Sequence, residues 1–402
     1  MSLSLPVSRF LLVLLVAPLA ACGGGDSTCA PTANFAPGVD HGPAVALPAP
    51  TAMSITWAST TSVVGSVEFG PTAAYGSTVA DASPGREHAL RLTGLTAAST
   101  WHYRLLHAGV PAGGDHVFRT PVADRTSAPF RFAVVGDGGT GCAEEFTVLA
   151  RVAAMTPDFV LHTGDVAYDA GTAQEVRNAF LIPFAPLCES VPVFVTWGNH
   201  DVGTSGGRPL ADAVVLPTND EEGTEYYASF DWGNLHTITL DSNRAYGPGS
   251  PQRLWLERDL ASPAALLATW TIVFFHHPAY SSSSHGSTAA VDAELVPVFD
   301  AHGVDLVFNG HDHDYERTHP MAAGAPTSTT GGPAYVDPLG TIYVVTGGGG
   351  KELYPAGTSA FTAFSVSAFH ALEVDVAGAS LTVTAIRDDG VTLDSFSITK
   401  TP

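Results

Sequence analysis

The stretch FRFAVVGD, residues 130–137, carries the pattern that decides the fold of this chain. Its first six residues are nearly all apolar and rich in β-branched and aromatic side chains, as expected for a strand covered on both faces of a sheet. The run ends in Gly136 and Asp137, so a carboxylate follows directly. Four later runs end in comparable polar residues: FVLHTGD at 159–165, VFVTWGNHD at 193–201, TIVFFHH at 271–277 and VDLVFNGHDH at 304–313. The sequence therefore predicts five core strands, each followed by carboxylate, amide or imidazole side chains.

Stretches of helical character separate these strands, at 144–155, 172–181, 252–260 and 288–301. Alternation of strand and helix predicts an α/β fold. Because open α/β sheets bind ligands at the carboxyl ends of their strands, we expect the polar side chains to meet at one edge.

The residue types at this edge favour a metal site. Carboxylate, amide oxygen and imidazole suit divalent and trivalent transition metals, and the absence of cysteine from the set argues against a closed structural zinc site. Two ions about 3.5 to 4 Å apart can share a carboxylate and hold a phosphate between them. The sequence therefore indicates hydrolytic chemistry at two metal ions.

The ordered motifs resemble the purple acid phosphatase branch of the calcineurin-like metallophosphoesterases. The tyrosine three residues after Asp165 and the later 315–317 segment, Tyr-Glu-Arg, also resemble this branch. The likeness covers roughly residues 40 to 400. It rests on GDGG at 136–139, GDVAY at 164–168, GNHD at 198–201, VFFH at 273–276 and GHDH at 310–313.

The resemblance implies a ligand set for Fe(III) and a second divalent ion, which would be zinc, iron or manganese. A phenolate is a hard anionic donor that suits Fe(III), and its charge transfer to that ion colours the family purple. An aspartate between two cations has a depressed pKa. The implied set is Asp137, Tyr168 and His313 on Fe(III), Asp165 as the bridge, and Asn199, His276 and His311 on the second ion.

The resemblance also implies a mechanism and a small phosphorylated substrate. A metal-activated hydroxide attacks the phosphorus of a monoester, and a protonated histidine donates to the leaving oxygen. His200 is similar to the family histidine that contacts substrate, and His285 falls where the family carries its candidate proton donor. His277 stands where plant members usually carry serine, so its role stays open. The expected function is that of an exported acid phosphatase.

Two alternatives remain. One is a phosphodiesterase or nucleotide-hydrolysing enzyme of the same superfamily, since ligands are shared and substrate choice lies in loops. The other, from a different class, is a non-catalytic surface binding protein, although all seven ligand positions are filled. The natural substrate, the second metal and the oligomeric state are open from sequence.

The amino terminus resembles that of a bacterial lipoprotein. Arg9 precedes an apolar stretch at 10–19, and Leu-Ala-Ala-Cys follows at 19–22. This order predicts a signal peptide at 1–21 and a lipid on Cys22 as the one membrane attachment, with the protein periplasmic or on the cell surface. Secretion after an ordinary cleavage is the alternative. A Gly-, Pro- and Ala-rich segment at 22–43 then predicts a flexible tether.

Two domains follow the tether. Short alternating segments with Gly, Pro and Ser turns at 44–122 predict a small all-β sandwich that resembles a fibronectin type III domain. Residues 126–400 form the predicted α/β catalytic domain, a two-sheet metallophosphoesterase sandwich flanked by helices. An alternating stretch at 371–398 is typical of closing strands of its second sheet.

The four cysteines allow a prediction of disulfide pairing. If Cys22 carries a lipid, we expect a disulfide bond between Cys142 and Cys188, because both lie beside the metal-bearing loops. Cys29 would then be a free thiol. The alternative is that all three cysteines are unpaired.

The net charge is -22, and only two of the seventeen basic residues are lysine. A surface that tracks nucleic acid needs clustered Lys and Arg, so the composition argues against a nucleic-acid partner.

Overall fold

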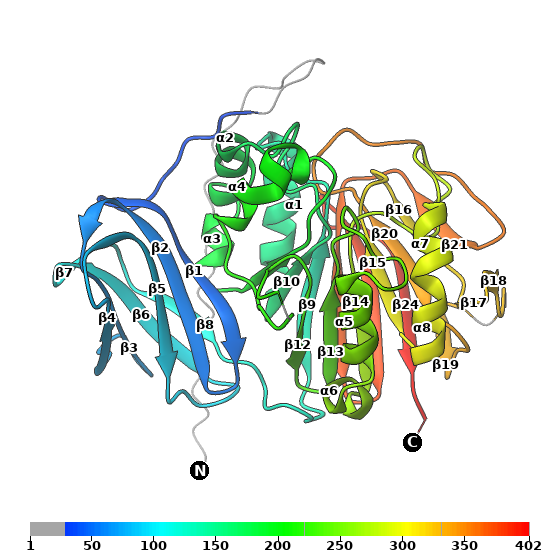
Figure 1. Ribbon diagram of the computed structural model, residues 1–402, viewed down its shortest axis with the longest axis horizontal. Coiled ribbons are helices and arrows are strands. Elements are labelled where there is room, and N and C mark those ends of the chain that lie inside the picture. Colours follow the sequence, from blue (N-terminus) through cyan, green and yellow to red (C-terminus); the bar gives the residue numbers. More distant parts are fainter. Residues whose placement is uncertain (1–28, 221, 331, 402) are drawn as a thin grey trace, which may run out of the picture.

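A computed structural model describes residues 29–220, 222–330 and 332–401 (Figure 1). The predicted signal peptide and Cys22 lie outside these residues. Within the described ranges, no helix has the length and apolar character needed to cross a membrane.

Two seven-stranded sheets form the larger part of the molecule, which confirms the predicted α/β class (Figure 1). The first sheet runs in the order β11 (Val193–Val195), β10 (Phe159–His162), β9 (Phe130–Val135), β22 (His370–Ala377), β23 (Ser380–Arg387), β24 (Thr392–Thr399) and β19 (Ala334–Val336). The second sheet runs β12 (Ala228–Trp232), β13 (Leu235–Thr239), β14 (Trp270–Phe274), β15 (Leu306–Asn309), β20 (Ile342–Thr346), β16 (Tyr315–Thr318) and β21 (Thr362–Val366). The carboxyl-terminal strands β22 to β24 thus complete the sheet that contains β9.

The main core lies between the two sheets. Apolar side chains of both sheets share one buried cluster, in which the rings of Phe132 and Phe308 meet edge to face at 6.5 Å. Burying one such ring contributes roughly 1.5 to 3 kcal/mol. Strands β9, β10 and β11 pair in parallel, as do β13, β14, β15 and β20. The predicted core strands therefore have parallel neighbours, and their carboxyl ends bring the polar residues to one region.

Helices lie between many of these strands along the chain. They are α1 (Ala143–Ala154), α2 (Ala173–Val176), α3 (Ala185–Cys188), α4 (Arg208–Ala211), α5 (Pro251–Leu260), α6 (Pro263–Leu267), α7 (Ala289–Glu294) and α8 (Val296–His302). Leu256 of α5, Val291 of α7 and Phe299 of α8 join a second buried cluster with Val273 and Val307 of the second sheet. These side chains explain why the helices pack there.

Two predicted helices are each divided in two. The stretch at 172–181 consists of α2 and a π-helical turn at Arg177–Leu181. The stretch at 288–301 is interrupted at Leu295, and Pro297 stands in the first turn of α8. Because proline lacks a backbone N–H, it suits the start of a helix and not its interior.

The amino-terminal part contains two antiparallel sheets with their own core around Met53, Trp57, Val67 and Tyr103. One sheet contains β1 (Val39–Ala49), β2 (Ala52–Val63) and β5 (Gly85–Thr93). The other contains β4 (Ser77–Ala80), β3 (Gly65–Gly70), β6 (Thr100–His107) and β7 (Val110–Pro111). Strand β8 (His116–Arg119) also pairs with β6. A small hairpin of β17 (Met321–Ala322) and β18 (Ala325–Pro326) forms a separate two-stranded sheet, and Met321 is bridged to Thr341, directly before β20.

Polar contacts join the amino-terminal sheets to the part that contains the two seven-stranded sheets. The hydroxyl of Tyr103 donates to the carbonyl of Glu189 at 2.7 Å. Arg119 forms an ion pair with Asp158 at 2.7 Å. Because the Tyr103 ring is completely buried, the first of these hydrogen bonds fixes the sandwich beside α3.

The predicted disulfide is wrong: Cys142 is bonded to Cys29, and Cys188 is a free thiol. The amide of Cys29 donates to the carbonyl of Thr140 at 2.9 Å, so this residue of the predicted tether lies against the loop before α1. Cys188 is the last residue of α3, packed against the core, and burial raises the pKa of its thiol to about 12. A thiol in such surroundings is chemically inert.

Candidate metal centre

All seven residues predicted to bind metal lie close together where strands of the two sheets end. Four follow the first sheet's parallel strands, and the other three follow β14 and β15. Asp137 comes after β9, Asp165 and Tyr168 after β10, Asn199 after β11, His276 after β14, and His311 and His313 between β15 and β16.

Asp137, Tyr168 and His313 form one group of buried side chains. The hydroxyl oxygen of Tyr168 lies 3.3 Å from Oδ1 of Asp137 and 3.2 Å from Nε2 of His313. The third pair, Nε2 of His313 and Oδ1 of Asp137, is 3.7 Å apart. One carboxylate, one phenol and one imidazole therefore converge on a common point.

His276 is the centre of a second group. Its Nε2 lies 3.0 Å from Oδ1 of Asn199, 3.2 Å from Nδ1 of His311 and 3.4 Å from Oδ2 of Asp165. One donor atom from each of Asp137, Asp165 and His276 falls within 4.8 Å of the other two. The two groups are therefore adjacent, with Asp165 within reach of both.

The orientation of two histidines shows that these atoms suit metal ions. Nδ1 of His276 faces the carbonyl of Thr163 at 3.0 Å, and Nδ1 of His313 faces that of Glu352 at 2.7 Å. A neutral imidazole that donates from Nδ1 carries its lone pair on Nε2. The lone pair of His276 then points at the acceptor oxygens of Asn199 and Asp165, which repel it unless a proton or a metal ion lies between them. Backbone carbonyls orient metal-binding histidines in the same way.

The electrostatics of these side chains favour positive charge. Burial by itself would raise the pKa of Asp165, but His276 and the backbone N–H of His200 hold the carboxyl well below its usual range. Burial would also lower the pKa of His276, yet Asp165 and Asp137 raise it to about 10. Burial and the same two carboxylates raise the pKa of the Tyr168 phenol far above its ordinary value, so its ionisation requires a strongly charged cation.

Three of the seven residues hold an uncommon backbone conformation. The φ angles of Asp137, Asp165 and His311 are 56°, 51° and 74°, in the left-handed region. Such conformations cost on the order of 1 to 3 kcal/mol each and cluster at functional sites. A Cβ at Gly310 would collide with the carboxylate of Asp137, and one at Gly198 with that of Asp165. The glycines of the motifs therefore permit the close approach of the loops.

His200 and His285, the two predicted catalytic residues, lie at the rim of this centre. Nδ1 of His200 is 2.6 Å from the carbonyl of Asp169, and its ring lies 4.5 Å from that of Tyr168. The exposed ring of His285 stacks on His311 at 4.2 Å. Both imidazoles therefore border the side chains that are predicted to bind metal.

The serine-rich loop at 281–287, which carries His285, is firmly held. The buried carboxylate of Asp312 accepts hydrogen bonds from the amide of His285 at 2.7 Å, the amide of Gly286 at 3.1 Å and the hydroxyl of Ser281 at 2.5 Å. The carboxylate of Glu316 accepts from the amide of Ser282 at 2.6 Å. The chain that presents His311 and His313 thus also positions His285.

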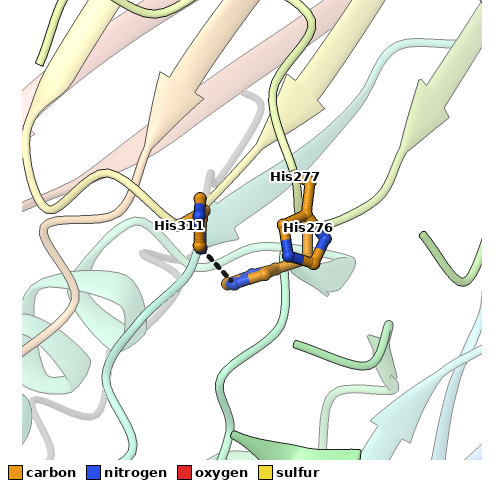
Figure 2. A group of neighbouring side chains, drawn as sticks. All are labelled: His276, His277 and His311. Carbon is orange, nitrogen blue, oxygen red and sulfur yellow. Dashed lines mark hydrogen bonds between the residues drawn. The ribbon is translucent and has the colours of Figure 1, made fainter. Parts of the chain in front are cut away.

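Sequence reasoning missed Asp201 and Asp312 as positioning residues. Asp201 is buried and accepts from the amides of Gly198 at 2.8 Å, Ala167 at 3.0 Å and Val166 at 3.2 Å, so it joins the loops after β10 and β11. Both aspartates stood inside the motifs already singled out: Asp312 lies between two predicted ligands and Asp201 ends the motif that contains Asn199, and these places were the available signal. Figure 2 shows His277, whose role was left open, beside His276 and His311.

The chain is similar to known phosphoesterases and acid phosphatases. The family model described as calcineurin-like phosphoesterase matches residues 130–315. "Purple acid phosphatase 15" of Arabidopsis thaliana is 30% identical over 300 residues, which cover 66% of this chain and 54% of the plant protein. "Acid phosphatase type 7" of Mus musculus is 28% identical over 346 residues, or 75% of this chain and 76% of the mouse protein.

A solved structure has the same fold. It is that of purple acid phosphatase PPD1 from yellow lupin (Lupinus luteus), with a TM-score of 0.77 at 22% identity, covering 89% of this chain and 74% of the lupin chain. The matches to the first three Arabidopsis relatives extend over 54 to 62% of their length, so this chain spans little more than half of those proteins.

Proposed function

We propose that this chain, which carries a calcineurin-like phosphoesterase domain with purple acid phosphatases among its homologues, is an exported acid phosphatase. It would hydrolyse small phosphate monoesters at two metal ions. The observation that carries the proposal is the set of acceptor atoms around Nε2 of His276, from Asn199, His311 and Asp165. This set lies beside the group of Asp137, Tyr168 and His313 described above.

The donor chemistry supports an assignment of the ions. Asp137, Tyr168 and His313 would hold Fe(III), because a phenolate and a carboxylate are hard anionic donors. Asn199, His276 and His311 would hold a divalent zinc, iron or manganese ion, and Asp165 would lie between the two. When bound, the pair of ions supplies Lewis acidity toward phosphoryl oxygens and lowers the pKa of water.

The two rim histidines have separate proposed tasks. In its doubly protonated form His200 donates from Nδ1 to the carbonyl of Asp169, which fixes its ring, and its Nε2 can donate to a phosphate oxygen. His285 is exposed and is held over His311 by Asp312, so its imidazole can pass a proton to the leaving oxygen. Neither task requires a covalent enzyme intermediate.

The test compares a monoester with a diester. Purified protein is assayed on p-nitrophenyl phosphate and bis(p-nitrophenyl) phosphate from acidic to neutral pH, with Asp165→Asn as the inactive control. We expect turnover of the monoester to dominate. Faster hydrolysis of the diester would favour the phosphodiesterase alternative, and two bound metals without turnover of either would favour a binding protein.

We further propose that residues 44–122 form a fibronectin-like domain and residues 126–400 the catalytic domain. The strand order of the amino-terminal sheets, β1-β2-β5 and β4-β3-β6 with β8 on β6, supports the first part. The sequence at 19–22 supports lipid attachment at Cys22. Metabolic labelling with a fatty acid tests the anchor: the label should be lost in Cys22→Ala, and an equally labelled variant would refute it.

A further inference from the structure

His277 lies beside the second group of predicted ligands without a place in it. One of its ring nitrogens falls within 4.8 Å of ring nitrogens of His276 and His311 (Figure 2). Its ring centre is 5.0 Å from that of His276 and 4.5 Å from that of His311. His276 is fully buried, whereas His277 is partly exposed. The His277 imidazole therefore borders the second group on a side that solvent can reach.

Ser242 holds this imidazole from the neighbouring strand. Strands β13 and β14 pair in parallel as far as Thr239 and Phe274, so the residues that follow them lie side by side. The hydroxyl oxygen of Ser242 accepts from the amide of His277 at 3.1 Å and lies 2.8 Å from Nδ1 of the ring. One serine thus fixes both the backbone and the ring.

The same contacts favour one tautomer. Among the residues that the structure describes, Nδ1 of His277 is the sole acceptor within reach of the Ser242 hydroxyl. A hydroxyl that donates to Nδ1 leaves the ring proton on Nε2. Nε2 has no hydrogen-bond partner in the described part of the chain, so its N–H is free to donate.

This tautomer is the opposite of that in His276 and His313. Those rings donate from Nδ1 to backbone carbonyls and keep a lone pair on Nε2. A protonated Nε2 offers no lone pair to a metal ion, but it donates a strong hydrogen bond to an anionic oxygen. A tetrahedral oxyanion held at the second group is the ligand that matches such a donor.

We propose that His277 is a substrate-contacting residue that donates from Nε2 to a phosphoryl oxygen and does not bind metal. This inference deepens the proposed function and rests on it for the identity of the substrate. The proton stays on Nε2 throughout, so the residue acts by binding and orienting the phosphoryl group. Ser242 acts as its positioning residue.

The experiment measures binding of inorganic phosphate by calorimetry, together with metal content and kcat and KM on p-nitrophenyl phosphate. His277→Ala should keep the wild-type metal content while its affinity for phosphate falls by about tenfold or more, the loss expected for a hydrogen bond to a charged group. His277→Gln, which retains an N–H donor, should recover part of the affinity. Ser242→Ala should show a smaller loss, because the ring remains while its tautomer is no longer fixed.

The outcomes separate the possible roles. Loss of one metal ion in His277→Ala would make the residue a ligand and overturn the proposal, as would an unchanged affinity for phosphate. Similar losses in His277→Ala and His277→Gln would indicate a packing role and also overturn it. Because calorimetry needs no turnover, a wild-type protein that binds phosphate through His277 without hydrolysing esters would refute the proposed function and leave this inference standing.

Discussion

His236 lies between two carboxylates, and this arrangement makes the stability of the protein depend on pH. The ring is buried in β13, with Nδ1 2.7 Å from Asp231 and Nε2 2.8 Å from Asp259. Burial alone would lower the pKa of His236, but the hydrogen bonds and charges of the two aspartates raise it to about 9, against 6.5 for an ordinary histidine. The folded protein therefore holds a proton here that the unfolded chain loses at lower pH.

The sign and size of the effect follow from this difference. A folded pKa above the unfolded one gives stability that is complete below pH 6.5 and is lost as the pH rises through 9. At 1.36 kcal/mol for each pKa unit, the difference between the folded pKa of about 9 and the unfolded pKa of 6.5 corresponds to about 3 kcal/mol. The side chain of Asp231 is 38% exposed, so solvent screens its electrostatic interaction with His236. We therefore expect a contribution of about 2 to 3 kcal/mol to the free energy of unfolding.

The assay is urea unfolding at pH 6 and pH 9.5, with a chelator present so that metal binding does not contribute. Wild-type protein should lose about 2 to 3 kcal/mol more unfolding free energy across this range than His236→Gln, which is neutral at both values. His302→Gln, at the exposed end of α8, is the matched control and should keep the wild-type pH dependence. Parallel pH profiles for wild type and His236→Gln would refute the reasoning.

Three other perturbations test the site and its support. Tyr168→Phe should remove a visible absorption band of the iron-loaded protein, because the phenolate is its proposed source; a surviving band contradicts that assignment. His285→Gln should slow alkyl phosphates about 100-fold or more and nitrophenyl phosphate much less, since a good leaving group needs little protonation; equal losses on both substrates exclude the proton-donor role. Cys142→Ser should lower the unfolding free energy by about 2 to 4 kcal/mol, because the bond to Cys29 closes a long loop; unchanged unfolding would contradict this stabilising role.

The core strands and most helices could be predicted because their signals are local. The run at 130–135 is apolar throughout, and β9 occupies those same residues. Helix α1 begins and ends within one residue of the predicted stretch at 144–155. The seven predicted ligands meet because parallel strands carry their carboxyl ends to one region, although their binding of metal stays a prediction.

Contacts between distant segments could not be predicted. The pairing of Cys142 with Cys29 depends on where the amino-terminal segment lies, and the hydrogen bond from Cys29 to Thr140 has no signature in the sequence. The hydrogen bonds between Ser242 and His277 likewise depend on the neighbouring positions of β13 and β14. Such contacts follow from the order of strands in the sheets.

The most direct test of the central claim is a crystal structure of metal-loaded protein with anomalous scattering data. We predict two anomalous peaks about 3.5 to 4 Å apart, one within the group of Asp137, Tyr168 and His313 and the other beside Asn199, His276 and His311, with Asp165 between them. A single peak, or two peaks that Asp165 does not join, would contradict the account.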